Sequence, residues 1–480
     1  MLRILACLIA MMLCALPARA FDRDLWESYP TMNYVTGLAE SNEAIYVATT
    51  GGIRRYDRFA QRWLAPLTRL DGLPDNQVQT LVFDPDMREL WFNTPAGSGR
   101  WLEGLQTIMS GGIPPGQGVL PRKLSYMPPL VPPFGYYVEP NRIIGPRSDY
   151  AVTGSLIDSW RTLWIGTWGL GVGQANLTDQ QLHFDTFGPL VENVTAMAFD
   201  GPDLWMGGAD TYREPARGMT RYNRQTRTWT YFEPVNIIGL ENAQVVTILA
   251  DSTTVWFGTA AGLTRYDKRS KRWVSYRDTA RWGRINALTQ DGPVLWMGSD
   301  RGLALLDTRK DSLDRVSGSE QAVIRAMAGG PEFIWAGTES GLYRCVRGTR
   351  KWRPVSDAQK LCKRPIRALT VSDSTLWATT EYPSALLRHR VGTDVWQEFT
   401  LPDLSATSYA GIAVAPGQVW VSTDNGAFML DVPRNIWTRY HAADGLISGK
   451  VQAVLADTDD IWFGTAQGLS RFRRSRAFPK

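Results

Sequence analysis

Few side chains in this sequence have the types and spacing that catalysis requires. The chain contains three histidines, His183, His389 and His441, and none lies beside a Gly-x-Ser-x-Gly turn or within an HExxH motif. The glycines between 166 and 173 are not followed by the helix that a phosphate-binding loop needs, so we assign them to a turn between strands. Acidic residues nowhere reach the density of a calcium loop. We therefore expect no catalytic constellation, no metal site and no cofactor.

Two cysteines in the second half of the chain could pair. Cys345 and Cys362 would close a loop of 17 residues, and a disulfide there would contribute ~3 kcal/mol by the chain-entropy estimate. Neither a second CxxC nor clustered histidines accompany them, which argues against zinc. We predict a Cys345–Cys362 disulfide, and the alternative is two buried thiols.

The first 20 residues have the features of a secretory signal. Arg3 provides the positive start, Leu5 to Leu16 the apolar run, and Ala18-Arg19-Ala20 the small residues before a cleavage site. The alternative is a retained N-terminal anchor, but the apolar run is shorter than the ~20 residues that span a bilayer. We predict cleavage before Phe21 and a periplasmic or secreted protein, an environment in which a disulfide is stable.

The charge balance limits the classes of partner. Lysine and arginine number 52 against 47 acidic residues, a net charge of +5. A nucleic-acid surface needs clustered positive charge, so we expect no nucleic-acid partner. After the leader, no stretch is apolar enough to predict a transmembrane segment.

Tryptophan marks an internal repeat. The chain has 20 tryptophans, and the phrase at Val255–Thr259, followed by 262–267 and 273–276, recurs along it. Neighbouring copies lie about 40 residues apart, with one longer gap. The ten copies are centred on Tyr46, Trp91, Trp164, Trp205, Trp256, Trp296, Trp335, Trp377, Trp420 and Trp462.

Each copy predicts four short strands, which is the blade of a β-propeller. We therefore expect an all-β fold in which residues 21–480 form a single ring of about ten blades, with a proline-rich insertion at 111–150. The last copy stops near Phe472, and Leu25–Tyr29 reads as a fourth strand without a blade, so we predict that this N-terminal strand closes the ring. Two rings of five would need a seam near residue 280, where the sequence has no linker composition.

We assign the repeated tryptophans to packing between blades. The same applies to the arginines at one recurring strand position: Arg55, Arg221, Arg265, Arg344 and Arg471.

Two further phrases carry a resemblance. Asp71-Gly72-Leu73-Pro74 and Asp444-Gly445-Leu446, together with the Trp-containing and Gly-Leu-x-Arg-Tyr-Asp phrases, resemble the two-component regulator propeller repeat. The resemblance implies an extracytoplasmic sensor propeller. Because no kinase or DNA-binding part accompanies the repeats, it also implies a separate signalling partner, such as a membrane histidine kinase.

Departures from the repeat are the places where a ligand could bind, because loops vary without disturbing the blades. We predict that the insertion at 111–150 lies over the channel mouth as a partial lid. Aromatic rings beside arginine and glutamate suit a sugar-like or peptide-like ligand. The candidate ligand-binding residues are Tyr136, Tyr137, Trp168, Tyr212, Arg213, Glu214, Arg281, Trp282, Glu381 and Tyr382.

Three classes of function fit this pattern. The first is a ligand- or protein-binding module, which we favour. The second is a propeller-shaped lyase or hydrolase acting on a carbohydrate or lactone, which typically lines its channel with histidines and carboxylates. The third is a scaffold in an envelope complex. The three histidines here do not share one inner-strand position, which argues against the enzyme.

Overall fold

The chain folds almost entirely as β-strands, as the repeat predicts. The computed structural model describes residues 22–112, 126–145, 148–211, 216–234, 237, 240, 243–277, 282–319, 322–356, 360–393, 395–400 and 409–479. Within these ranges the strands form ten antiparallel sheets, nine of four strands and one of six. The predicted leader lies outside the described residues. No helix in the described ranges combines the length and apolarity needed to cross a membrane.

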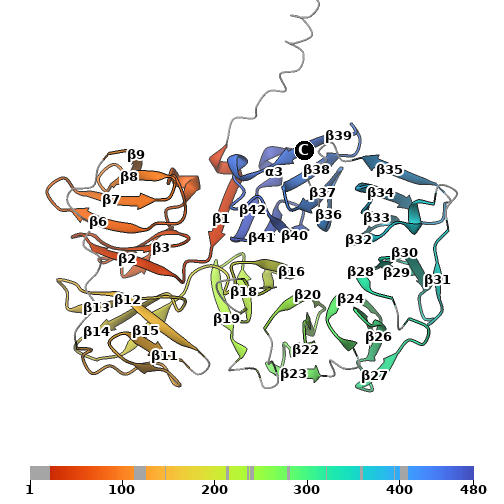
Figure 1. The fold of residues 1–480 in the computed structure, drawn as a ribbon, viewed down its shortest axis with the longest axis horizontal. Helices are drawn as coiled ribbons and strands as arrows, with labels where there is room; N and C mark the ends of the chain where they lie inside the picture. The colour runs from red at the N-terminus through yellow and green to blue at the C-terminus, as the bar shows by residue number, and fades with distance from the viewer. Residues whose placement is uncertain are drawn as a thin grey trace, which may run out of the picture.

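Seven of the sheets close into a ring (Figure 1). Their innermost strands contact one another in the order β16, β20, β24, β28, β32, β36 and β40, and β40 contacts β16. The blades are β16–β19 (Val194–Asp200, Asp203–Gly208, Met219–Asn223, Thr228–Phe232), β20–β23 (Val245–Ala250, Thr254–Thr259, Gly262–Asp267, Arg272–Arg277), β24–β27 (Ile285–Asp291, Val294–Ser299, Gly302–Asp307, Ser312–Arg315), β28–β31 (Ile324–Gly329, Phe333–Thr338, Gly341–Val346, Trp352–Pro354), β32–β35 (Ile366–Ser372, Thr375–Thr380, Ala385–Arg390, Trp396–Thr400), β36–β39 (Tyr409–Ala415, Gln418–Thr423, Gly426–Asp431, Ile436–Tyr440), and β40–β42 with β1 (Val451–Ala456, Ile461–Thr465, Gly468–Phe472, Trp26–Pro30).

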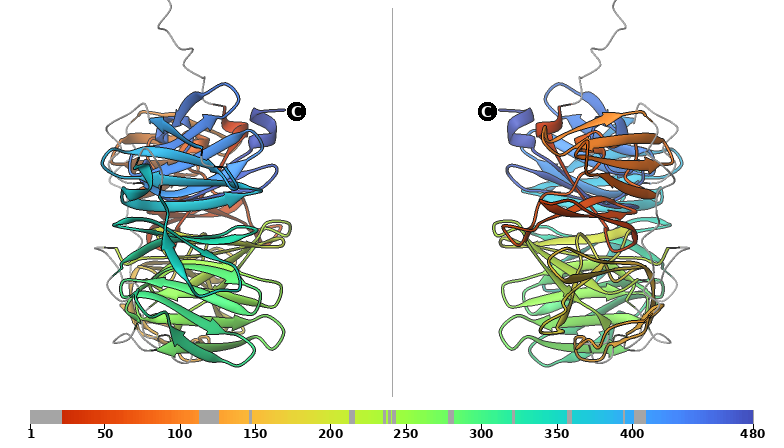
Figure 2. Two further views of the ribbon diagram at one scale, coloured as in Figure 1. Left: turned by 90° about the vertical axis from the view of Figure 1, so that its right-hand side faces the viewer. Right: turned by 90° about the vertical axis from the view of Figure 1, so that its left-hand side faces the viewer.

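The other three sheets form a separate lobe, which we call the three-sheet lobe. Strand β2 lies between β6 and β12 in it, and the lobe sits beside the ring and not over its face (Figures 1 and 2). Its sheets are β2–β5 (Val35–Glu40, Ala44–Thr49, Gly52–Asp57, Arg62–Trp63), β6–β9 (Thr80–Asp84, Glu89–Thr94, Gly97–Leu102, Thr107–Ser110) and β10–β15 (Tyr137–Val138, Arg142–Ile144, Asp149–Ile157, Thr162–Thr167, Val172–Asn176, Leu182–Asp185). The short helical turns are η1 (Arg23–Leu25), η2 (Arg69–Asp71), η4 (Leu361–Lys363), η5 (Ala442–Asp444) and α3 (Arg474–Ala477).

The ten repeats are confirmed, but the prediction of one ring of ten is wrong. Strand β40 packs against β16 and not against β2, so the circle closes after seven blades. Side chains of all seven inner strands line the channel, and none of β2, β6 or β12 does. Propellers of four to eight blades keep the channel narrow enough for inner side chains to fill much of it. The first three repeats therefore form their own arc.

Closure by the N-terminal strand is confirmed. β1 pairs antiparallel with β42, Trp26 opposite Phe472 and Pro30 opposite Gly468. Trp26 packs with Tyr440, Phe463 and Phe472, with ring centroids 4.9–6.0 Å apart. The Asp-Gly-Leu phrase has a role here: a Cβ on Gly445, whose φ is +121°, would lie 2.4 Å from the Trp26 ring. Only glycine leaves room for the closing tryptophan at this turn.

Tryptophans and arginines fill the wedges between blades, as predicted. Trp205, Trp256 and Trp462 are almost fully buried. In each of these blades the third-strand residue opposite the tryptophan is an arginine, as in the pair Trp256 and Arg265. The guanidinium carbon of Arg265 lies 5.9 Å from the Trp256 ring centroid, within the range of a cation–π contact.

The closure generates a stability prediction. Trp26→Ala should lower the free energy of unfolding of the ring by about 3–5 kcal/mol, because it empties a buried aromatic site at the closing seam. Guanidinium denaturation followed by circular dichroism measures this. Phe59→Ala, which truncates a ring that is 69% exposed, is the matched control and should change stability by less than about 1 kcal/mol. Equal effects of the two substitutions would contradict the closure.

Candidate functional site

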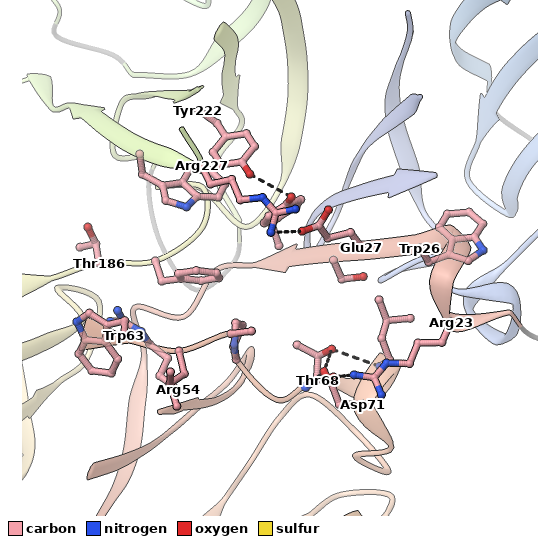
Figure 3. Close-up of a pocket in the computed structure, with 18 of the residues that line it drawn as sticks. Arg23, Trp26, Glu27, Arg54, Trp63, Thr68, Asp71, Thr186, Tyr222 and Arg227 are labelled. Carbon is pink, nitrogen blue, oxygen red and sulfur yellow. Dashed lines mark hydrogen bonds and ion pairs between the residues drawn. The ribbon is translucent and has the colours of Figure 1, made fainter. Parts of the chain in front are cut away.

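A cavity of about 620 Å³ lies where the three-sheet lobe meets the ring. Its walls come from β1, from β4 and the segment that follows it as far as η2, from the end of β15 and the two residues after it, and from β18 and β19 (Figure 3). Pockets that bind small ligands typically measure ~300–1,000 Å³ and combine apolar walls with a few placed polar groups. We call this space the interlobe cavity.

Two chain crossings form the neck beside the cavity. The chain leaves the ring after β1, builds the lobe and returns to the ring before β16. The two crossing segments are hydrogen-bonded to each other. Met32 N donates to Phe187 O at 3.1 Å, and Thr31 Oγ1 donates to Pro189 O at 3.0 Å. The closing strand of the ring therefore continues directly into the lobe.

Aromatic side chains form the wall on the ring side. Tyr222 packs against Trp229 with ring centroids 4.4 Å apart and against Tyr29 at 5.2 Å. The two tyrosine hydroxyls are 3.1 Å apart and hydrogen-bonded. Burial raises the pKa of both Tyr29 and Tyr222 above the usual value, so both hydroxyls are neutral at physiological pH.

Arg54 holds a fixed charge on the lobe side. Its guanidinium carbon lies 3.7 Å from the Trp63 ring centroid and 5.7 Å from that of Phe187. Nη1 donates to Asp185 O at 2.9 Å. Burial lowers the pKa of Arg54 to about 10, so the side chain remains a cation at neutral pH. This wall combines an apolar face with a positive edge.

Ion pairs frame the rest of the cavity. The Glu27 carboxylate lies 3.1 Å from Arg471 Nη1, 3.6 Å from Arg473 Nη2 and 3.7 Å from Arg227 Nη1. At the rim, Arg23 pairs with Asp71 across the two lobes (Figure 3). The described residues lining the cavity include neither histidine nor cysteine, so they suit binding better than acid–base or nucleophilic chemistry.

The channel of the ring is a second, smaller hollow of about 260 Å³. Arg325 and Arg367 line it, and each is paired with a glutamate from the turn between the second and third strands of its own blade. Arg325 Nη2 lies 2.5 Å from Glu339 Oε1, and Arg367 Nε lies 2.6 Å from Glu381 Oε1. These pairs neutralise the charges that a channel ligand would otherwise meet.

Those predicted ligand residues that the structure describes do not gather at one mouth. Glu381 and Tyr382 lie at the ring mouth, where Tyr382 is 85% exposed. Trp168 belongs to the lobe, where its ring packs against Tyr34 at 5.3 Å. Next to it, Gly169 O accepts a hydrogen bond from Arg217 of the ring. Tyr212, Arg213, Glu214 and Arg281 lie outside the described residues.

Trp282 packs the ring and does not face its mouth. It is 4% exposed and belongs to the cluster of Trp256, Leu263 and Ile285 between two blades. Trp282 lies between two repeats in the sequence, and a connection between two blades is expected to be exposed. The ligand role assigned to Trp282 is therefore corrected to interblade packing.

The described part of the insertion packs against a sheet of the lobe and does not line the ring channel, where a lid was predicted. Of residues 111–150, the structure describes 111–112, 126–145 and 148–150, and β10 and β11 extend the sheet of β12. Met127 and Ile143 pack with Val152 and Leu163, and Tyr136 joins this cluster. Tyr137 is 69% exposed. The described part covers the outward face of the last sheet of the arc, which has no further blade to cover it.

The predicted disulfide is absent. Cys345 and Cys362 are both reduced thiols. Cys345 Sγ lies 3.3 Å from Thr349 O, whereas Cys362 packs with Trp335 and Leu361 in the next wedge between blades. The short spacing in sequence does not bring the two together, because β30 and η4 direct them into separate environments.

This placement predicts the outcome of thiol mapping. Alkylation of the unfolded, unreduced protein followed by peptide mass spectrometry should find Cys345 and Cys362 both alkylated. In the native protein both should react slowly, since both are buried and burial raises the pKa of the Cys345 thiol. A disulfide-linked peptide pair in the map would refute the reduced state.

The sequence did not predict the residues that line the interlobe cavity. Trp63 and Trp229 occupy the aromatic position that recurs in the fourth strands, and this position predicts a packing role. The available signal was Arg54, an extra arginine beside the recurring Arg55. The cavity lies where the lobe, built from the first three repeats, meets the ring. The sequence does not mark the boundary between the third and fourth repeats, so it does not show which repeats meet there.

The fold and site together define a two-lobed β-propeller protein. No protein-family profile matches the chain, and no curated protein matches its sequence. Among solved structures it is similar to PorZ, described as an essential bacterial surface component of the type-IX secretion system of Porphyromonas gingivalis. The TM-score is 0.53 at 15% identity, covering 92% of this chain and 68% of that one. This likeness supports the propeller architecture.

Two further structures are similar at lower scores. The extracellular domain of BT4673 from B. thetaiotaomicron has a TM-score of 0.48 at 14% identity, covering 91% of this chain and 70% of that one. Virginiamycin B lyase from Staphylococcus aureus has a TM-score of 0.49 at 13% identity, covering 59% of this chain and 95% of the lyase.

Proposed function

We propose that this protein is an extracytoplasmic recognition module that binds a ligand in the interlobe cavity and acts with a separate signalling partner. The observation that carries the proposal is the construction of the cavity from both lobes and from the closing strand β1. A ligand in this position contacts Trp229 on the ring and Trp63 on the lobe. It therefore stabilises one placement of the lobe relative to the ring.

The chemistry of the walls suits a ligand with apolar faces and polar edges. Trp63 and Trp229 offer ring faces, while Arg54 and Glu27 offer a cation and a carboxylate. A sugar-like or peptide-like compound has this combination. Export through the leader at residues 1–20, and membership of the two-component regulator propeller repeat group, belong to the same proposal.

The neck gives binding a physical route to a partner. Because β1 both closes the ring and leads into the lobe, a shift of the lobe acts on the seam between β1 and β42. A ligand that binds one lobe placement better than another shifts the population towards it. The free energy available for this shift equals the difference between the ligand's binding free energies for the two placements of the lobe.

A thermal-shift screen of soluble oligosaccharides and peptides tests the proposal. At least one ligand that stabilises the wild type should lose at least about tenfold in affinity in both Trp63→Ala and Trp229→Ala, because each removes one wall of the cavity. Phe59→Ala, an exposed aromatic outside the cavity, should bind as the wild type does. Hits that both cavity variants retain but Arg367→Ala loses would place the site in the ring channel and contradict the proposal.

A further inference from the structure

One repeat position departs from its pattern in a way that opens a third hollow. In seven of the ten repeats the residue opposite the central aromatic is an arginine: Arg55, Arg100, Arg221, Arg265, Arg344, Arg388 and Arg471. Two blades place Leu305 and Met429 there. In the lobe, Gln174 stands opposite Trp164. It is the one uncharged polar residue at this position.

A groove of about 250 Å³ lies beside Gln174, between the sheets β2–β5 and β12–β15. In five of these repeats the arginine places its guanidinium over the tryptophan opposite it, as Arg471 does at 5.3 Å from Trp462. The shorter side chain of Gln174 does not extend this far. The groove is therefore the space that the usual arginine fills.

The groove has an organised floor. Asp158 accepts hydrogen bonds from Trp164 Nε1 at 3.0 Å and from the backbone N of Thr162 at 2.8 Å. Arg58, whose side chain is 2% exposed, lies 2.9 Å from Glu40 and 3.8 Å from Asp158. Its guanidinium carbon sits 4.7 Å from the ring centroid of Trp160. These contacts fix the loop that carries Trp160, whose ring is 47% exposed at the groove.

Carboxamides supply the polar wall. Gln61, Gln174 and Gln181 line the groove, and their side chains form no hydrogen bond with another residue in the described part of the chain. Each carboxamide can both donate and accept, which matches the hydroxyl groups of a polyol. The charge of Arg58 is already balanced by Glu40 and Asp158, so the groove offers no excess positive charge to an anion.

We propose that this carboxamide groove binds one or two sugar units of a neutral oligosaccharide. A pyranose ring stacks its apolar face on Trp160, and its hydroxyls exchange hydrogen bonds with the carboxamides. The volume lies just below the ~300–1,000 Å³ of pockets for whole small ligands, which fits the end of a longer chain. The site is separate from the interlobe cavity and shares no lining residue with it.

Isothermal titration calorimetry with cellotetraose, mannotetraose and maltotetraose tests this site, with tetragalacturonate as the charged comparison. At least one neutral tetrasaccharide should bind the full-length wild type with a Kd below about 1 mM. Trp160→Ala should weaken that binding by about tenfold or more. Gln174→Arg restores the residue of the other blades, so it should fill the groove and abolish binding while leaving the melting temperature unchanged or higher.

Two controls separate this site from the other proposals. Gln225→Ala removes an exposed carboxamide on a distant turn of the ring and should bind as the wild type does. Trp229→Ala disables the interlobe cavity and should also leave this binding intact. The inference is overturned if no neutral tetrasaccharide binds the wild type, if tetragalacturonate binds more tightly than all three, or if Gln174→Arg binds normally.

Discussion

The pairing of β1 with β42 is the constraint on which the rest of the structure depends. A sheet that ended at β42 would have an unpaired edge and would leave the wedge beside Tyr440 half covered. Strand β1 prevents both, because it adds five paired residues, among them Trp26. Because the added strand comes from the other end of the chain, its pairing joins the first and last segments of the ring. Without it the seventh blade has three strands, and the circle of inner strands would lose support at one seam.

The same strand explains why there are two lobes. Once β1 is used in the seventh blade, the chain must return to begin the first blade at β16, and it builds three sheets on the way. The lobe is thus an insertion between the closing strand and the ring that it closes. The hydrogen bond from Met32 N to Phe187 O keeps the two crossings together. An interlobe cavity beside β1 follows from this topology.

Local features of the fold were predictable, and the arrangement of the blades was not. The Trp phrase and the four short strands of each copy are local patterns, so ten four-stranded units follow from them. Closure followed from the unpaired strand at Trp26 and the missing one after Phe472. The ring size depends on whether β40 meets β2 or β16, and the inner strands of both have similar sequences, so the pattern does not decide between them.

The site prediction for Trp282 was wrong for a related reason. Trp282 and the described part of the insertion at 111–150 depart from the repeat, but both serve packing. Trp282 fills a wedge between two blades, and the described insertion residues cover the end of an open arc. The informative departures were single residues inside the repeat, Arg54 and Gln174. Their surroundings come from neighbouring blades and loops, so their meaning depends on the three-dimensional arrangement.

The central claim is that β1 and the blades from β16 to β42 form a complete ring without the lobe. Replacing residues 35–185 by a short Gly-Ser linker tests it most directly, because Met32 and Phe187 already lie within hydrogen-bond distance. The account predicts a soluble monomer with β-sheet circular dichroism and one cooperative unfolding transition, which Trp26→Ala in the same shortened chain destabilises. A shortened chain that is unfolded, or one that is indifferent to Trp26→Ala, would contradict the seven-bladed ring closed by its N-terminal strand.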